Sequence, residues 1–241
     1  MKVLWYPFIR GALVYFIVQP VVYGQPADDV EEPEEEVEEI VVTSTRSRQS
    51  LADMPTRVEV ITGEELGEKA NMKPGDIRML LNESTGIQVQ QTSATTFNSS
   101  IRIQGLDGRY TQMLRDGMPL YSGFAGGLGL LQVAPLDLQS VEVIKGSVST
   151  LYGGGAIAGL VNLNTKVPTS EPETSLLFNR TSAGGLDASA FSAARNEEIG
   201  GTLFASWNES TAYDPANIGL SAIPEFERWT INPRAFLYFD D

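Results

Sequence analysis

The sequence predicts an α+β domain in its N-terminal and central part, followed by a run of antiparallel β-strands. Helical and strand patterns alternate up to Lys166, and after Pro172 the texture changes to segments of about ten residues that loosely alternate polar and apolar side chains. Cysteine and histidine are both absent. Their absence excludes disulfides, thiolate or histidine metal sites, and Ser-His or Cys-His catalysis. The composition therefore argues against an enzyme.

The first 24 residues have the features of an export signal. Lys2 and Arg10 precede an apolar run over residues 11–18, and a small residue, Gly24, lies before the expected cleavage point at Gln25. A transmembrane anchor is the alternative. However, the unbroken apolar run is much shorter than the roughly 20 residues that span a bilayer, and Pro20 interrupts it. The pattern therefore favours export.

Residues 25–39 form an acidic segment that is expected to be disordered. Nine of the twelve residues from Asp28 to Glu39 are carboxylates, and like charges at this density repel and bury nothing. The segment lacks the spaced Asp, Asn and Gly of a calcium loop. The formal net charge of the chain, -14, argues against nucleic acid as a partner.

Residues 40–46 read IVVTSTR, a β-branched run with no partner strand nearby in the sequence. At the end of a flexible segment, such a run is suited to join another protein's sheet as an added strand held by backbone hydrogen bonds. The alternative is that it forms the first edge strand of the following domain. Its position in the chain favours the first interpretation.

The first half of the α+β domain combines two short helices with two strands. A strand is expected over 58–61, followed by a helix that opens on a capping box at Thr62–Glu65 and continues to about Ala70. A second helix is expected after Pro74, with Asp76 in its first turn, ending near Asn82. The alternation over 86–90 predicts the next strand.

The second half of the domain is expected to be strands joined by glycine turns. A hairpin is predicted from strand 101–103 through Asp107–Gly108 to strand 110–114, and a second turn at Asp116–Gly117. Residues 138–145 and 160–166 form a further strand pair. The glycines between 153 and 159 lack the spacing of a phosphate-binding loop and are expected to form a tight turn.

After Pro172, four segments resemble transmembrane β-strands. They cover residues 175–183, 188–195, 201–208 and 228–239. Trp207, Trp229, Tyr238 and Phe239 lie toward segment ends, as in the aromatic girdles at lipid interfaces. A soluble β-sandwich is the alternative, because the signal of each single strand is weak.

The order of strands and glycine turns from Ile101 to Lys166 resembles the plug domain of TonB-dependent outer-membrane receptors. The matching positions are Gly105, Asp116–Gly117, VEVIKG at 141–146, LYG at 151–153, Gly159, Asn162 and Thr165–Lys166. The resemblance implies an α+β plug domain followed by the beginning of an antiparallel transmembrane β-barrel, with about four strands of an expected 22. It divides the chain into a signal peptide (1–24), an acidic disordered tether (25–39), a TonB box (40–46), the plug domain (50–168) and the N-terminal strands of an incomplete barrel (172–241).

Three positions depart from the family's pattern. Gln104 replaces an arginine, so the charge held against the barrel wall is expected to be absent or supplied by Arg102 or Arg109. Arg115 stands where an apolar residue usually precedes the Asp-Gly turn, and Ser147 replaces a proline. Too few residues follow Lys166 to close a barrel, and an open sheet leaves backbone groups unpaired in hydrocarbon. We therefore expect a fragment of a longer receptor.

The resemblance implies active uptake of a large scarce nutrient, such as a ferric siderophore, haem or cobalamin. The expected location is the outer membrane, with the plug facing the periplasm. Expected partners are the energy-transducing protein TonB, outer-membrane lipid and the extracellular ligand, and the protein is expected to be a monomer without cofactor or metal. The expected TonB contacts are Ile40, Val41, Val42, Thr43, Ser44 and Thr45.

Ligand contacts are expected on two apical loops of the plug, residues 91–100 and 120–127. The candidates are Thr95, Phe97, Asn98, Tyr121, Ser122 and Phe124, whose flat apolar faces and hydrogen-bonding groups suit a large ligand. The alternative is that the aromatic side chains only pin these loops against the barrel.

Three other functions stay open at this point. A glycan importer of the same superfamily usually carries an extra domain before its TonB box. A secreted soluble β-rich binding module would be found in culture supernatant rather than in the outer membrane. A hydrolase would have to rely on paired carboxylates.

Overall fold

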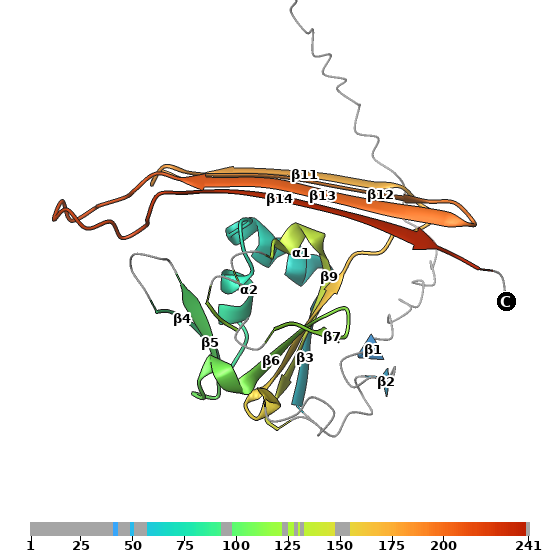
Figure 1. Cartoon of the computed structure of the whole chain (residues 1–241), viewed down its shortest axis with the longest axis horizontal. Helices are drawn as coiled ribbons and strands as arrows, with labels where there is room; N and C mark the ends of the chain where they lie inside the picture. Colours follow the sequence, from blue (N-terminus) through green and yellow to red (C-terminus); the bar gives the residue numbers. More distant parts are fainter. Residues whose placement is uncertain are drawn as a thin grey trace, which may run out of the picture. The chain divides into compact units, whose positions relative to one another are not determined.

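A computed structural model describes residues 41–42, 49–50, 57–92, 98–121, 125–127, 130, 133–147 and 155–239. The predicted signal peptide and acidic segment lie outside the described residues. The described part comprises an α+β domain and a separate sheet of four long strands, which Figure 1 shows as the long, gently curved ribbons labelled β11 to β14.

The α+β domain is built on a five-stranded mixed sheet. Its order is β3 (Arg57–Thr62), β9 (Leu138–Lys145), β10 (Gly159–Thr165), β6 (Thr111–Arg115) and β7 (Met118–Pro119). Strand β10 is antiparallel to β9 and parallel to β6. The odd-numbered apolar residues of β9 and β10, among them Val143 and Val161, are fully buried in the main core. The predicted strand pair 138–145 and 160–166 is confirmed.

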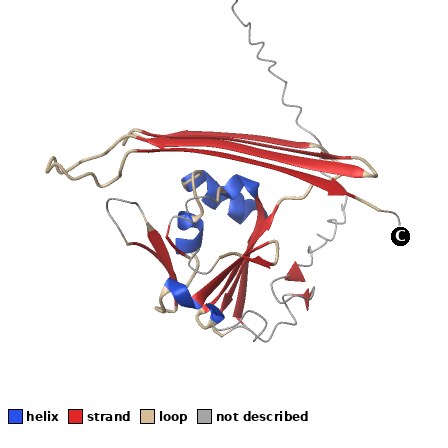
Figure 2. Ribbon diagram, viewed as in Figure 1, coloured by secondary structure: helices blue, strands red, loops and turns tan. Residues whose placement is uncertain are grey.

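Two helices cover this core. Helix α1 (Gly63–Met72) buries Leu66 and Ala70, and α2 (Arg78–Asn82) buries Leu80 and Leu81. Figure 2 shows both helices in blue, between the strands of the domain and the four-stranded sheet. Thr62 occupies the N-cap position of α1, but its side chain makes no capping hydrogen bond, so the predicted capping box is wrong.

Helix α2 starts later than predicted. The expected first turn after Pro74 is not helical, because the carboxylate of Asp76 accepts the backbone N–H of Arg78 and fixes a tight turn before the helix.

The predicted hairpin around Asp107–Gly108 is also wrong. Strand β5 (Ser99–Ile103) pairs with β4 (Ile87–Gln91) and β8 (Gly126–Gly127) in a second sheet, not with β6. Asp107 instead caps a 3₁₀ turn at Gly108–Tyr110 by accepting the N–H of Arg109. A Cβ on Gly108 would lie 2.9 Å from the carbonyl oxygen of Ile101, so this glycine permits a close approach of chains.

The turn at Asp116–Gly117 is confirmed and joins β6 to β7. Both residues have positive φ, 50° and 76°, as a tight hairpin turn with the twist of its strands requires. The Asp116 carboxylate accepts the backbone N–H and the hydroxyl of Thr165, and thereby ties the turn to the end of β10.

The four-stranded sheet is an antiparallel meander in chain order. Its strands are β11 (Glu173–Arg180), β12 (Gly185–Arg195), β13 (Ile199–Ser210) and β14 (Phe226–Leu237). They agree with the four predicted segments, with boundaries shifted by a few residues.

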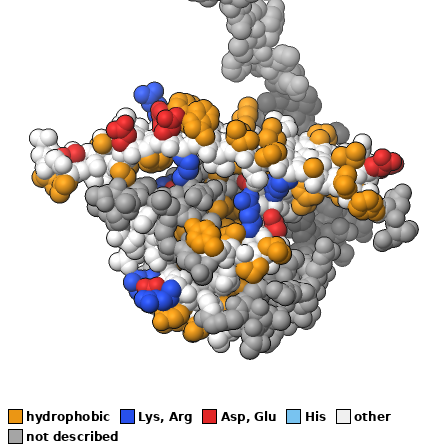
Figure 3. Space-filling view, viewed as in Figure 1, with side chains coloured by type: hydrophobic (Ala, Val, Ile, Leu, Met, Phe, Trp, Pro, Cys, Tyr) orange, Lys and Arg blue, Asp and Glu red, His pale blue; other side chains and the backbone are white. Residues whose placement is uncertain are grey.

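The buried face of this sheet carries several polar side chains, and the exposed face carries large apolar ones. Ser189, Thr202, Ser206 and Asn208 lie on the buried face. The opposite face carries Leu176, Phe178, Trp229, Ile231 and Leu237, whose exposed fractions run from 65% to 81%, and Figure 3 shows hydrophobic side chains gathered along the sheet. A half-buried sheet in water has the opposite arrangement. The apolar outer face argues against a soluble β-sandwich and is typical of a lipid-facing sheet.

The outer face ends in an aromatic row. Trp207 and Trp229 are paired in register, and their rings stack with centroids 5.4 Å apart. Phe178 lies in the same row on β11. The next row toward the strand ends contains Arg180, Leu186, Glu209 and Glu227. A step from aromatic to charged side chains is typical of the boundary between hydrocarbon and headgroups.

Within the described part of the chain, no helix is long and apolar enough to cross a membrane.

Candidate functional site

The predicted TonB contacts are only partly described. Val41 and Val42 form strand β1 (Val41–Val42), which pairs with β2 (Gln49–Ser50) over two residues and not with the five-stranded sheet. The other four, Ile40, Thr43, Ser44 and Thr45, lie outside the described residues.

Of the predicted ligand contacts, Asn98 and Tyr121 are described. The remaining four, Thr95, Phe97, Ser122 and Phe124, lie outside the described residues. Asn98 is half-buried and its backbone carbonyl accepts the N–H of Thr92, whereas the Tyr121 side chain is 63% exposed. Pairing of Ser99 with Gly127 brings the ends of the two predicted ligand loops together.

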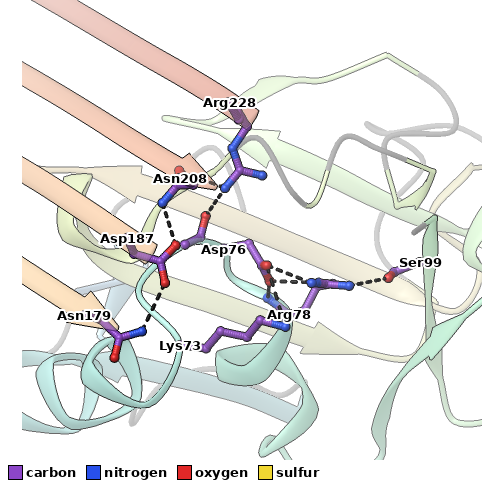
Figure 4. Close-up of polar contacts among 9 residues, drawn as sticks. Lys73, Asp76, Arg78, Ser99, Asn179, Asp187, Asn208 and Arg228 are labelled. Carbon is purple, nitrogen blue, oxygen red and sulfur yellow. Dashed lines mark hydrogen bonds and ion pairs between the residues drawn. The ribbon is translucent and has the colours of Figure 1, made fainter. Parts of the chain in front are cut away.

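The described site with the most polar contacts joins the α+β domain to the four-stranded sheet. Its first part, the Gly75 contact, is a row of side chains on the inner face, one from each strand: Asn179, Asp187, Asn208 and Arg228. Asn179 and Asn208 each donate an amide hydrogen bond to Asp187, at 3.1 and 2.8 Å. Arg228 donates to the side chain of Asn208 at 3.0 Å and to the backbone carbonyl of Gly75 at 2.5 Å. Figure 4 shows these side chains converging from the strands.

Gly75 permits this contact because it has no side chain. A Cβ at this position would lie 2.6 Å from Oδ1 of Asp187 and 3.4 Å from the amide nitrogen of Asn208. Its φ is not in the left-handed region, so the requirement for glycine comes from the approach of the sheet and not from backbone conformation.

An ion pair supports the Gly75 contact from inside the domain. Asp76 and Arg78 are both buried, and the guanidinium donates to both carboxylate oxygens at 2.9 Å and to the hydroxyl of Ser99 at 3.1 Å. Burial lowers the pKa of Lys73, whose Nζ lies 3.9 Å from Asp76. Burial also acts to raise the pKa of Asp76, but the hydrogen bonds from Arg78 and the nearby positive charges outweigh it and hold the pKa below its ordinary 3.8.

This depressed pKa predicts a contribution to acid sensitivity. The ionised Asp76 stabilises the folded state above the ordinary pKa of 3.8, and that stability is lost as the pH falls through the lower folded pKa. We expect the urea midpoint of the wild type in detergent micelles to fall more steeply with acid than that of Asp76→Asn. Parallel curves for the two proteins below about pH 4 would contradict the assignment.

The second part, the Asp137 contact, centres on a buried carboxylate. Asp137 ends the 3₁₀ turn η4 (Pro135–Asp137) and is 4% exposed. Its Oδ2 accepts hydrogen bonds from Arg115 of β6 and Asn232 of β14, each at 2.8 Å, and its Oδ1 accepts from Arg234 of β14. Burial raises the pKa of Asp137 above its ordinary value, although Arg234, Asn232 and Arg115 oppose the shift.

An apolar contact accompanies the Asp137 contact. Phe191 and Phe204 of the sheet pack with Ala134 and Leu136 of the domain. A cavity of about 190 Å³ lies beside them, and its lining includes Arg115, Asp137 and Asn232.

Where the chain leaves the α+β domain, side chains of the sheet contact the connection to β11. We call this group of five residues the exit clasp: Lys166, Pro168, Phe191, Arg195 and Tyr238. Lys166 lies 4.8 Å from the ring centroid of Phe191, and it forms an ion pair with Glu173. The Tyr238 hydroxyl donates to the carbonyl of Pro168 at 3.5 Å, while the Arg195 guanidinium lies 4.0 Å from the Tyr238 ring.

The charge expected against the barrel wall was to be absent or supplied by Arg102 or Arg109, and the hydrogen bonds and ion pairs of these two arginines lead to the domain itself and not to the four described strands. Arg102 donates to Gln90 and to the carbonyl of Gly105, and Arg109 pairs with Asp107, all within the domain. The described polar contacts from the domain to the sheet come from Gly75 and Asp137, together with Lys166 and Pro168 where the chain leaves the domain. The polar positions of β14 at a period of two, from Arg228 to Arg234, were the signal that could have indicated the sheet side of this interface.

Together, these contacts hold the α+β domain against the four-stranded sheet. Among the described residues, no three metal-ligating side chains of His, Cys, Asp or Glu gather into a cluster.

Comparison with known proteins agrees with this architecture. Residues 50–160 match the family "TonB-dependent Receptor Plug Domain". The chain is 31% identical over 164 residues to the vitamin B12 transporter BtuB of Vibrio vulnificus, covering 68% of this chain and 26% of the relative. It is 29% identical over 201 residues to the ferric aerobactin receptor of Klebsiella pneumoniae, covering 76% and 26%.

Solved structures show the same fold. The ferric yersiniabactin uptake receptor FyuA of Yersinia pestis has a TM-score of 0.60 at 19% identity, covering 75% of this chain and 28% of that one. FpvA of P. aeruginosa gives 0.59 at 20% identity, covering 70% and 22%. The chain thus spans about a quarter of the length of the curated relatives it matches. With a plug domain seated on the polar face of a sheet whose other face is apolar, the chain belongs to the TonB-dependent outer-membrane receptors.

Proposed function

We propose that the chain provides the plug and first barrel strands of a receptor that imports a large scarce nutrient: a ferric siderophore, haem or cobalamin. The observation that carries this proposal is the plug held by the Gly75 and Asp137 contacts against a sheet with an apolar outer face. Relatives named for cobalamin and for ferric aerobactin support the solute class. The ligand would meet the two loops that contain Thr95, Phe97, Asn98, Tyr121, Ser122 and Phe124.

Uptake in cells tests this proposal. The receptor that carries this sequence is expressed in a strain without its own siderophore, haem and cobalamin receptors, and accumulation of each labelled solute is measured with and without TonB. We expect TonB-dependent accumulation of one solute class. Uptake of none of them, with the protein present in the outer-membrane fraction, would contradict the proposal.

We also propose that residues 40–45 are the segment that TonB binds. The pairing of β1 with β2 covers only two residues, and so short a ladder is marginal in water. Its strand can therefore be released to join a sheet of the partner through backbone hydrogen bonds.

A peptide spanning Glu39 to Arg46 is expected to retain the C-terminal domain of TonB in a pull-down. Replacing Val41 by proline removes a backbone donor and should abolish retention. A peptide with an established TonB box serves as the positive control. If that control binds and the wild-type peptide does not, the assignment is wrong.

A further inference from the structure

The carboxylate of Asp137 is shared unequally between two arginines. Arg115 belongs to the plug and occupies Oδ2 together with Asn232, whereas Arg234 belongs to the sheet and contacts Oδ1 through Nη2 alone. The exposed fractions of the side chains are 5% for Asp137, 18% for Arg234 and 35% for Arg115. The sheet arginine is thus half-buried and holds its partner by one hydrogen bond.

Arg234 has unused donors at this site. Its Nε and Nη1 are buried and have no hydrogen-bond partner among the described residues. A guanidinium beside a carboxylate favours a two-bond fork, in which both oxygens accept from it. Here Arg115 and Asn232 already occupy Oδ2, so the fork is not formed.

We propose that Arg115 is a positioning residue that limits how tightly the sheet holds the plug, because it competes with Arg234 for Asp137. Without Arg115, Arg234 can turn its second donor to Oδ2 and form the fork, which strengthens the ion pair between Asp137 of the plug and Arg234 of the sheet. With Arg115 in place, Oδ2 of Asp137 stays hydrogen-bonded to a side chain of the plug itself. The ion pair between Asp137 and Arg234 then holds the plug against the sheet but stays weak enough for the plug to be released.

The position of Arg115 connects this balance to the predicted ligand loop. Arg115 is the last residue of β6, pairs in register with Met118 of β7, and directly precedes the Asp116–Gly117 turn. The chain continues from β7 through Leu120 to Tyr121, at the start of the second loop. Movement of that loop would shift Arg115 relative to Asp137. The link between the ligand loop and Arg115 rests on the proposed function, whereas the competition between Arg115 and Arg234 for Asp137 does not.

Hydrogen exchange tests the competition directly in the purified full chain in detergent micelles, without TonB or ligand. In Arg115→Gln, we expect amide exchange over residues 133–139 and 228–236 to slow by about tenfold, the effect of one added charge-assisted hydrogen bond. In Arg234→Gln, the same segments should exchange faster. Arg109→Gln changes an exposed arginine of the same domain and should leave both segments unchanged.

The direction of change decides the outcome. If Arg115→Gln exchanges faster, as Arg234→Gln does, Arg115 is simply another stabilising partner and the inference is overturned; no change also overturns it. Circular dichroism identifies a variant that fails to fold, and Arg115→Lys then provides a second test, because a lysine donates without a fork and should give an intermediate rate. Failure of nutrient uptake with the expected exchange rates would contradict the proposed function but not the competition.

Discussion

Asp137→Asn is expected to lower the free energy of unfolding by about 3 kcal/mol, because it leaves two arginines without their carboxylate. Arg234 is mostly buried and cannot recover its hydration, while Arg115 is about one-third exposed and can recover part of it. Burial also raises the pKa of Asp137 and so opposes its charged form, which is a second reason to expect a loss at the lower end of the range for breaking a buried ion pair. Urea unfolding of the chain in detergent micelles, followed by tryptophan fluorescence, measures the loss.

Asp107→Asn is the matched control for this substitution. Asp107 also pairs with an arginine, Arg109, but both side chains are well exposed and water replaces the partner. We expect no measurable change in the unfolding midpoint. Equal losses for the two variants would show that the burial of Asp137 does not determine its contribution.

Gly75→Ala is expected to destabilise the seated plug by about 2 kcal/mol. The added Cβ would lie 2.6 Å from Oδ1 of Asp187, so this side chain has to move. Asp187 is held by Asn179 and Asn208, and a shift breaks hydrogen bonds along the row that ends in Arg228. Hydrogen exchange over residues 73–78 and 205–210 should accelerate together.

Gly67→Ala provides the comparison for the glycine change. Gly67 lies exposed in α1, and apart from its chain neighbours and the backbone of the helix itself, no atom is within 4 Å of the position of its Cβ. Alanine at this site is expected to raise stability by up to about 1 kcal/mol, since glycine is unfavourable inside a helix. If both alanine variants behave alike, the close approach of the sheet to Gly75 is not what requires glycine there.

The sequence predicted correctly those elements that neighbouring residues along the chain determine. The Asp116–Gly117 turn follows from two residues that tolerate positive φ, and β9 and β10 follow from their apolar patterns. Asp107–Gly108 has the same dipeptide but a different cause: Gly108 is needed because the chain at Ile101 approaches it. No local pattern distinguishes these two uses of glycine.

The contacts between plug and sheet could not be predicted in the same way. Arg115 departs from the family's pattern, but its partner Asp137 is 22 residues away and the sheet arginine Arg234 is 97 residues from that carboxylate. Likewise, Gly75 meets Arg228 across 153 residues. Such pairs depend on the register of four strands and on how the plug lies against them, which a single sequence does not specify.

The exit clasp has a consequence for reversibility. Only six residues separate Lys166 from the first residue of β11, so the Lys166 end of a plug released from both contacts stays within about 25 Å of that strand. Rebinding is then intramolecular, with an effective concentration in the millimolar range, and does not depend on how many copies the cell contains. A displaced plug should therefore rebind to the sheet without a chaperone once the displacing force ends.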